Sequence, residues 1–300
     1  MSERMKILIG CDGSEYSEKI LADLKCAGLP QQAEVLILTV AEHWLVPPTS
    51  FGGVDVLYVE APKDAEKTLA IAQQMQSSLH QIFPEWVITP EAAWGAVASQ
   101  LIEHADDWKP DLLVVGSHGR SLLGRLLLGS ASQHVLHDAH CSVRIGRATE
   151  AAADAPVKII IAMDGSASAN AAVDVVAARS WPTGSEVRLV NGTWIVTPAS
   201  SAHLVAGPIA DWVRTENERV RLALDDAVLK LTAHGLTVST LVEEADPVTL
   251  ICDLAKSWKA DCIFLGARGM GAVERLMIGS ISSAVAAKAP CSVEVIRKSK

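Results

Sequence analysis

Residues 116–130 read Gly116-Ser-His-Gly119-Arg-Ser-Leu-Leu-Gly-Arg125-Leu-Leu-Leu-Gly129-Ser130, and residues 266–280 read Gly266-Ala-Arg-Gly269-Met-Gly-Ala-Val-Glu-Arg275-Leu-Met-Ile-Gly279-Ser280. Both copies keep the same spacing: glycine, two residues, glycine, nine residues, then Gly-Ser. Each copy follows an apolar strand-like run and leads into a helix-like segment. Glycine lets a backbone approach a bulky anion, and a Gly-Ser that opens a helix offers free N–H groups and the positive end of the helix dipole. The repeated stretch therefore predicts a phosphate-binding loop in each copy.

A second motif lies upstream of each copy. The apolar run Lys6–Cys11 ends in Asp12-Gly-Ser, and Lys158–Met163 ends in Asp164-Gly-Ser. Apolar runs then alternate with amphipathic stretches. In the first copy we expect strands at 6–11, 35–40, 86–92, 111–116 and 142–146, with long helices at 62–82 and 96–108. This alternation predicts an α/β fold with a parallel, doubly wound sheet and right-handed crossovers.

With both motifs present twice, the chain resembles the ATP-binding branch of the universal stress protein family over nearly all 300 residues. The resemblance implies two tandem flavodoxin-like (adenine nucleotide alpha hydrolase-like) domains, at 1–146 and 157–300, joined by a linker at 147–156. Each would be a five-stranded parallel sheet in the order 3-2-1-4-5. Strands one and four are then neighbours at the point where the winding reverses, and such points bind ligands. The two motifs of each half should therefore meet in one crevice.

The resemblance also implies the residues that bind ATP in each half. In the first half they are Gly10, Cys11, Asp12, Val40, Val115, Gly116, Ser117, His118, Gly119, Arg120, Gly129, Ser130 and Ala131. In the second half they are Ala162, Met163, Asp164, Gly192, Leu265, Gly266, Ala267, Arg268, Gly269, Gly279, Ser280 and Ile281. Mg²⁺ is expected to bind through the phosphates, with Asp12 and Asp164 as candidate protein ligands. The alternative role for both aspartates is a helix N-cap or turn residue.

Other charged and titratable residues of the repeated stretch leave alternatives open. His118 either lines the phosphate loop or assists hydrolysis as an acid or base. Arg125 and Arg275 either steer phosphate or lie on the surface. The stretch does not end in Gly-Lys-Ser/Thr, so it is not a P-loop. A metal site at His134, His137 and His140 is disfavoured because the second copy has Ala284, Ala287 and Pro290 there.

Composition limits the class of protein. The apolar fraction is 49% and the mean hydropathy +0.25, which is typical of a folded rather than a disordered chain. A formal net charge of −9 argues against binding to nucleic acid or to an anionic membrane. We expect a cytoplasmic protein, because the N-terminus does not resemble a signal peptide. The six cysteines form no Cys-x-x-Cys pair, so buried thiols are favoured over a redox switch.

The function implied by the family is a nucleotide-linked sensor or regulator of a stress response. One alternative is an enzyme on the same scaffold, a slow ATPase or an adenylyl transferase. Another is a carrier or scaffold whose inserts, at about 41–61 and 193–211, bind an apolar or protein ligand. The final strands, Ser142–Ile145 and Ser292–Ile296, should pair the two halves as an internal pseudo-dimer, because unprotected sheet edges seek a partner. A further homodimer is an open expectation.

Overall fold

The computed structural model describes residues 4–41, 62–117, 128–147, 155–192, 208–269 and 278–297. The predicted inserts fall mostly outside these ranges. The first half contains β1 (Met5–Cys11), α1 (Glu15–Lys25), β2 (Ala33–Ala41), α2 (Pro62–Ile82), β3 (Val87–Trp94), α3 (Val97–Trp108), β4 (Leu112–Gly116), α4 (Ser130–Asp138) and β5 (Ser142–Gly146). The second contains β6 (Lys158–Ala162), α5 (Ala167–Ala178), β7 (Glu186–Gly192), α7 (Pro208–Ala233), β8 (Thr237–Glu243), α8 (Pro247–Trp258), β9 (Cys262–Gly266), α9 (Ser280–Lys288) and β10 (Ser292–Ile296).

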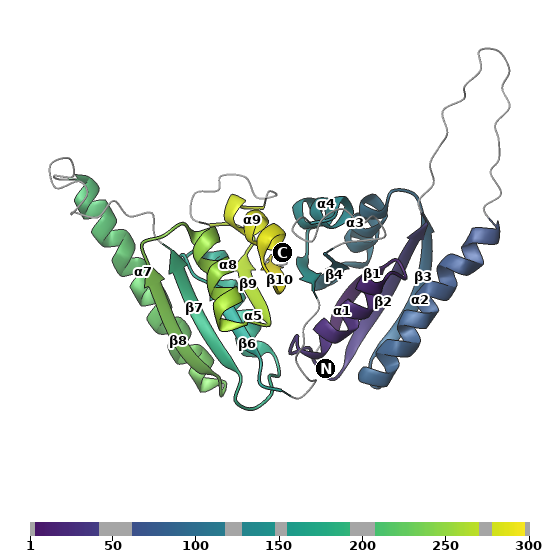
Figure 1. Ribbon diagram of the computed structural model, residues 1–300, viewed down its shortest axis with the longest axis horizontal. Helices are drawn as coiled ribbons and strands as arrows, with labels where there is room; N and C mark the ends of the chain where they lie inside the picture. The colour runs from purple at the N-terminus through teal and green to yellow at the C-terminus, as the bar shows by residue number, and fades with distance from the viewer. Residues whose placement is uncertain are drawn as a thin grey trace, which may run out of the picture.

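All these strands form one sheet of ten, in the order β3-β2-β1-β4-β5-β10-β9-β6-β7-β8 (Figure 1). Within each half the strands are parallel, and β5 pairs with β10 in the antiparallel sense. The predicted order 3-2-1-4-5 is confirmed, and the second half repeats it in mirror order. The predicted pairing of the halves through their last strands is confirmed as well.

The middle strand of each half is apolar and buried over its central residues. Ile7, Leu8 and Ile9 of β1 are fully buried, as are Ile159, Ile160 and Ile161 of β6. Continuous apolar runs of this kind are typical of parallel strands covered by helices on both faces. The long helix of the second half begins at Pro208, within the stretch of about 193–211 that was predicted to be an insert.

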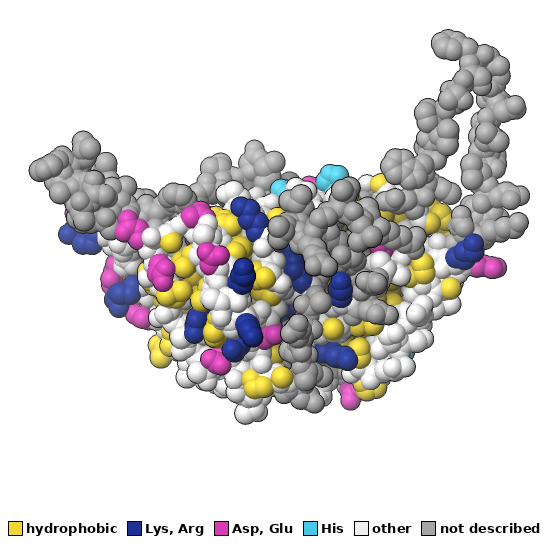
Figure 2. All heavy atoms as spheres, in the orientation of Figure 1, with side chains coloured by type: hydrophobic (Ala, Val, Ile, Leu, Met, Phe, Trp, Pro, Cys, Tyr) yellow, Lys and Arg dark blue, Asp and Glu magenta, His cyan; other side chains and the backbone are white. Residues whose placement is uncertain are grey.

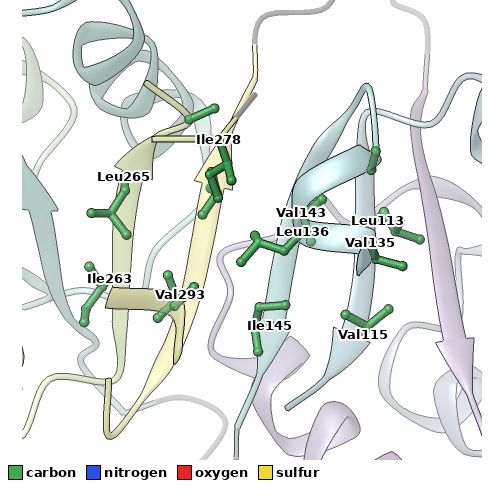
Figure 3. Close-up of a cluster of buried hydrophobic side chains, with 14 of the residues drawn as sticks. Leu113, Val115, Val135, Leu136, Val143, Ile145, Ile263, Leu265, Ile278 and Val293 are labelled. Carbon is green, nitrogen blue, oxygen red and sulfur yellow. The ribbon is translucent and has the colours of Figure 1, made fainter. Parts of the chain in front are cut away.

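One hydrophobic cluster crosses the boundary between the halves. Val143 and Ile145 of β5 share it with Val293 of β10 and with residues of α4 and α9 (Figure 3). The other two clusters lie almost wholly within one half each. This shared core joins the two halves into one continuous sheet.

A network of buried charges also lies at this boundary. Arg144 of β5, fully buried, donates to both carboxylate oxygens of Asp23 at 2.7 and 2.8 Å and to Glu294 Oε2 at 3.0 Å. Arg144 and Glu294 are opposite each other in the β5–β10 register. Glu294 also pairs with Arg179, whose Nη1 donates to the carbonyl oxygen of Ala27 at 2.8 Å. The pKa of Arg144 lies well above its ordinary value, because these carboxylates outweigh the desolvation that alone would lower it.

The surface and the helices are relevant to the predictions that the chain binds neither nucleic acid nor a membrane. Over the second half, on the face shown in Figure 2, Asp and Glu side chains lie among those of Lys and Arg rather than in an area of one sign. Within the described ranges, no helix is both long and apolar enough to cross a bilayer. That the chain binds no nucleic acid stays a prediction.

Candidate functional site

A cavity of about 430 Å³ lies in the second half, at the carboxyl ends of β9, β6 and β7. Residues of α8 and the first turns of α5 and α9 complete its wall. This is the switch point at which parallel sheets of this winding bind ligands. Its lining comprises Ala162, Met163, Asp164, Ala169, Val190, Asn191, Gly192, Pro247, Ile251, Leu265, Gly266, Arg268, Gly269, Gly279, Ser280, Ile281 and Ser282.

Nearly every residue predicted for the second site belongs to this lining. The exception is Ala267, which is buried, and whose carbonyl oxygen accepts a hydrogen bond from the Gly279 N–H at 2.7 Å. The two ends of the repeated stretch are thus joined directly, although residues 270–277 between them lie outside the described ranges. The structure therefore brings Asp164, Gly266, Gly269 and Gly279 together, as expected from the strand order that the family resemblance implied.

The start of α9 forms one end of the cavity. Its N-cap is Gly279, so no side chain occupies the capping position, and Ser280 and Ile281 of the first turn line the cavity. The hydroxyl of Ser282 donates to the Gly266 carbonyl at 2.7 Å and holds this helix against the end of β9. The N–H groups and dipole of a helix start attract an anion. This end is suited to phosphate.

Two glycines of the loop are required by close packing. A Cβ on Gly266 would lie 2.5 Å from the carbonyl carbon of Ser168, at the start of α5. A Cβ on Gly269 would lie 2.7 Å from Asp164 Oδ2. We expected these glycines to allow close approach of an anion; the structure shows that they also allow close approach of the neighbouring loop and helix.

Asp164 helps to form the turn between β6 and α5. Its Oδ1 accepts the Ser166 N–H at 2.9 Å, while Ser166 is the N-cap of α5 and accepts the Ala169 N–H at 3.2 Å. The cap role considered for Asp164 therefore belongs to Ser166, and Asp164 has the turn role. Ser166 and Ser168 also donate to the carbonyl oxygen of Arg268, which ties the phosphate-loop candidate to this helix start.

Arg219 is a residue of the site that sequence reasoning missed. It reaches from α7 and donates to the carbonyl oxygens of Gly165 and Asp164, the latter at 2.7 Å, and it pairs with Glu216 on its own helix. Gly165 has a φ of 71°, which favours glycine, and a Cβ there would meet the Arg219 guanidinium at 2.9 Å. The sequence does not single out Arg219, because it is one of several charged residues in α7. In the first half, Ile71 of α2 packs against the equivalent Gly13.

Asn191 lies at the far end of the cavity, near the end of β7. Its Nδ2 donates to the Met163 carbonyl oxygen at 2.6 Å. Its Oδ1 is buried and has no hydrogen-bond partner among the described residues. Val190, Pro247 and Ile251 give this end of the lining an apolar character.

The first half repeats much of this arrangement. Asp12 Oδ1 accepts the Ser14 N–H at 3.0 Å, Gly129 N–H donates to the Ser117 carbonyl at 2.8 Å, and Ser132 donates to the Gly116 carbonyl at 2.6 Å. Gly10, Cys11, Val40, Val115, Ser130 and Ala131 lie at the corresponding places around the ends of β1, β2 and β4 and the start of α4. His118, Gly119 and Arg120 lie outside the described residues, as do Arg125 and Arg275.

The remaining titratable candidates have structural contacts. Burial raises the pKa of Cys11 and Cys141 to about 11 and that of Cys291 to about 12, so these thiols are protonated at neutral pH. His140 Nδ1 lies 2.7 Å from Asp106 Oδ1, and His137 Nε2 lies 3.2 Å from the Ser283 hydroxyl. Within the described ranges, no three His, Cys, Asp or Glu side chains are grouped to hold a metal ion.

Comparison with known proteins gives a consistent result. The Universal stress protein family profile matches residues 3–147 and again residues 157–297. A universal stress protein of Mycolicibacterium smegmatis is 25% identical, with 97% of this chain and 96% of that protein covered. Universal stress protein A homolog 2 of Coxiella burnetii is 32% identical over 48% of this chain and 94% of its own length.

A solved structure shares the fold. The crystal structure of a universal stress protein from Archaeoglobus fulgidus matches with a TM-score of 0.61 and 21% identity, covering 98% of this chain and 97% of that one. At this level of identity the likeness concerns the fold alone.

Proposed function

The chain belongs to the universal stress protein family, in which it has two tandem domains, and from this premise we propose that it is an ATP-binding regulator of a stress response. The observation that carries the proposal is the cavity in which Asp164, Gly269 and Gly279 converge at the start of α9. Its volume of about 430 Å³ falls in the range of about 300–1,000 Å³ typical of small-molecule sites.

The two ends of the cavity suit the two ends of a nucleotide. The triphosphate would bind at the first turn of α9, beside Gly269 and Arg268, where N–H groups and a guanidinium attract negative charge. The adenine would lie at the β7 end, among Val190, Pro247 and Ile251. Mg²⁺ would be held chiefly by the phosphates, and Asp164 supplies the carboxylate oxygen that this hard cation prefers.

We propose that the first half carries a corresponding site of different affinity. Asp12, Gly116 and Gly129 match Asp164, Gly266 and Gly279, whereas Thr39 and Val40 are replaced by Asn191 and Gly192. The loss of the valine removes apolar surface beside the base, and Arg268 in place of His118 adds charge beside the phosphates. These two effects oppose each other. We therefore expect the two sites to differ in their affinity for ATP, without predicting which of them binds more tightly.

Titration calorimetry and native mass spectrometry of the full chain test the proposal. We expect ATP to bind with a stoichiometry of two and more tightly than GTP. Asp12→Ala and Asp164→Ala should each remove one site. Failure of the full chain to bind ATP with or without Mg²⁺ would refute the proposal, and one site abolished by only one variant would restrict it to that half.

The enzyme alternative is tested in the same samples. Steady release of ADP or AMP from the bound nucleotide would favour a slow ATPase or adenylyl transferase. Retention of intact ATP favours the regulatory role, which we also propose to be exercised in the cytoplasm.

A further inference from the structure

The amide of Asn191 has a single orientation that satisfies its hydrogen bond to Met163. A backbone carbonyl oxygen only accepts hydrogen bonds, so the Asn191 NH₂ group must face it, at 2.6 Å. The amide oxygen is therefore directed away from that contact. Asn191 is 5% exposed, and its Oδ1 has no hydrogen-bond partner among the residues that the structure describes.

A buried acceptor without a partner is unfavourable, and native proteins contain few of them. Such a group in the wall of a ligand cavity is explained most simply by a donor that the ligand supplies. Asn191 belongs to that wall, at the end of the cavity farthest from the proposed phosphate loop: β7 is separated from β9 by β6. The donor must therefore belong to the base end of the ligand.

The neighbouring side chains narrow the choice of ligand group. Val190, Pro247 and Ile251 provide an apolar wall that suits the face of an aromatic ring. One amide acceptor beside such a wall suits an N–H on the edge of the ring. The 6-amino group of adenine is such a donor, whereas a 6-oxo group in its place is an acceptor and would be repelled by the amide oxygen.

We propose that Asn191 is a specificity-determining residue of the second cavity, whose side-chain oxygen accepts a hydrogen bond from the 6-amino group of the bound purine. This inference rests on the proposed nucleotide-binding function. It adds a hydrogen bond to the apolar contacts proposed for the base at Val190, Pro247 and Ile251.

The first half differs at this place. Thr39 occupies the position of Asn191 in the register, and it is buried, with its hydroxyl 3.0 Å from Cys11 Sγ. The hydroxyl thus has a partner within the protein. Recognition of the 6-amino group by a side chain is therefore expected only in the second half. The two sites should consequently differ in how strongly they prefer a 6-amino purine to a 6-oxo purine.

Binding of ATP and of inosine triphosphate (ITP), which has an oxo group in place of the 6-amino group, tests the inference. The full chain would carry Asp12→Ala, so that the second site is measured alone. With Asn191 present, we expect ATP to bind at least about tenfold more tightly than ITP, the size of one well-placed hydrogen bond. Asn191→Leu should abolish this preference, because ATP loses its hydrogen bond to the amide oxygen and ITP is no longer repelled by that oxygen.

Two further variants keep the test decisive. Asn191→Thr introduces the residue that folds at this place in the first half, and it should lose the preference as the leucine variant does. Thr39→Val, in the first half, should leave the preference of the second site intact.

The outcomes separate this inference from the proposed function. If ATP binds the second site but Asn191→Leu and Asn191→Thr keep the full preference for ATP over ITP, the role of Asn191 is refuted and the proposed function stands. Equal binding of ATP and ITP by the chain that retains Asn191 also refutes that role alone. Absence of ATP binding at the second site overturns both.

Discussion

Arg147, which follows the first half, caps the C-terminus of α9 in the second half, and Arg297, which follows β10, caps the corresponding helix α4 in the first half. Arg147 Nη2 donates to the Ala286 carbonyl near the end of α9 at 2.5 Å, and Arg297 Nη2 donates to the Leu136 carbonyl near the end of α4 at 2.6 Å. A cation at a helix C-terminus satisfies carbonyls that lack an intrahelical partner and complements the dipole. Burial lowers the pKa of both guanidiniums from their ordinary value. The rim of the junction is therefore nearly symmetric, whereas its centre, with Arg144 opposite Glu294, is not.

Arg144→Met should strongly destabilise the chain. It would leave the buried carboxylate of Asp23 without the guanidinium that donates to both of its oxygens, and loss of one partner from a buried ion pair costs about 3–5 kcal/mol. The measurement is the free energy of unfolding in urea. Lys230→Met is the control, because it breaks an exposed pair with Asp174 that contributes at most about 1 kcal/mol. Equal effects of the two variants would contradict the role given to the central network.

Gly269→Ala should weaken ATP binding at the second cavity by about tenfold or more, the effect of misplacing one charged contact. The added methyl would lie 2.7 Å from Asp164 Oδ2 and must displace either the carboxylate or the loop. The unfolding midpoint should change little. Gly279→Ala is the control, because its Cβ would meet the Ala267 carbonyl oxygen at an ordinary 3.4 Å. A smaller effect on binding is expected there, and the reverse order would show that the clash with Asp164 is unimportant.

Arg219→Leu should weaken ligand binding at the second cavity more than it weakens the fold. The guanidinium holds the turn that carries Asp164 through two backbone carbonyls, so its loss frees the carboxylate to move. We expect a several-fold rise in the dissociation constant for ATP. Arg221→Leu tests the same helix without touching the site, since Arg221 is exposed and pairs with Glu218 and Asp225. Its binding should match the unmodified chain.

Stability should fall as the pH rises from about 9 toward 12. Burial raises the pKa of Cys291 from 9.0 to about 12, so this thiol keeps its proton in the folded chain at a pH where the unfolded chain has lost it. The unfolded state then binds fewer protons, and the free energy of unfolding decreases by up to about 1.4 kcal/mol per pH unit for such a group. Cys291→Ala should reduce this slope between pH 9 and 11. An unchanged slope would show that this thiol does not contribute.

The fold could be predicted because its signals are local and repeated. Apolar runs such as Lys6–Cys11 predict buried strands, Asp-Gly-Ser predicts a turn before a helix, and each signal occurs twice. The strand order came from the family resemblance, since periodicity does not say which strands are neighbours. The start of α7 at Pro208 lies within the predicted insert, and the proline itself is the local signal for it, because proline is favoured in the first turn of a helix.

The glycines and aspartates of the candidate site were predictable for the same reason, whereas its supporting residues were not. Arg219 and Asn191 act through contacts with backbone carbonyls of distant segments, and no spacing rule predicts such contacts. The sequence also carries a signal at Arg144. A charged residue in the middle of an apolar strand indicates a buried partner, and the second copy has the opposite charge, Glu294, at the same place.

That opposition has a consequence for assembly. Two first halves joined in the same way would bury Arg144 against a second Arg144, and two second halves would bury Glu294 against its own copy. Each half thus excludes a duplicate of itself and accepts only its counterpart. A molecule built in this way always contains one site of each kind, so the ratio between the two unlike cavities is fixed at synthesis and does not depend on how much of the protein the cell makes.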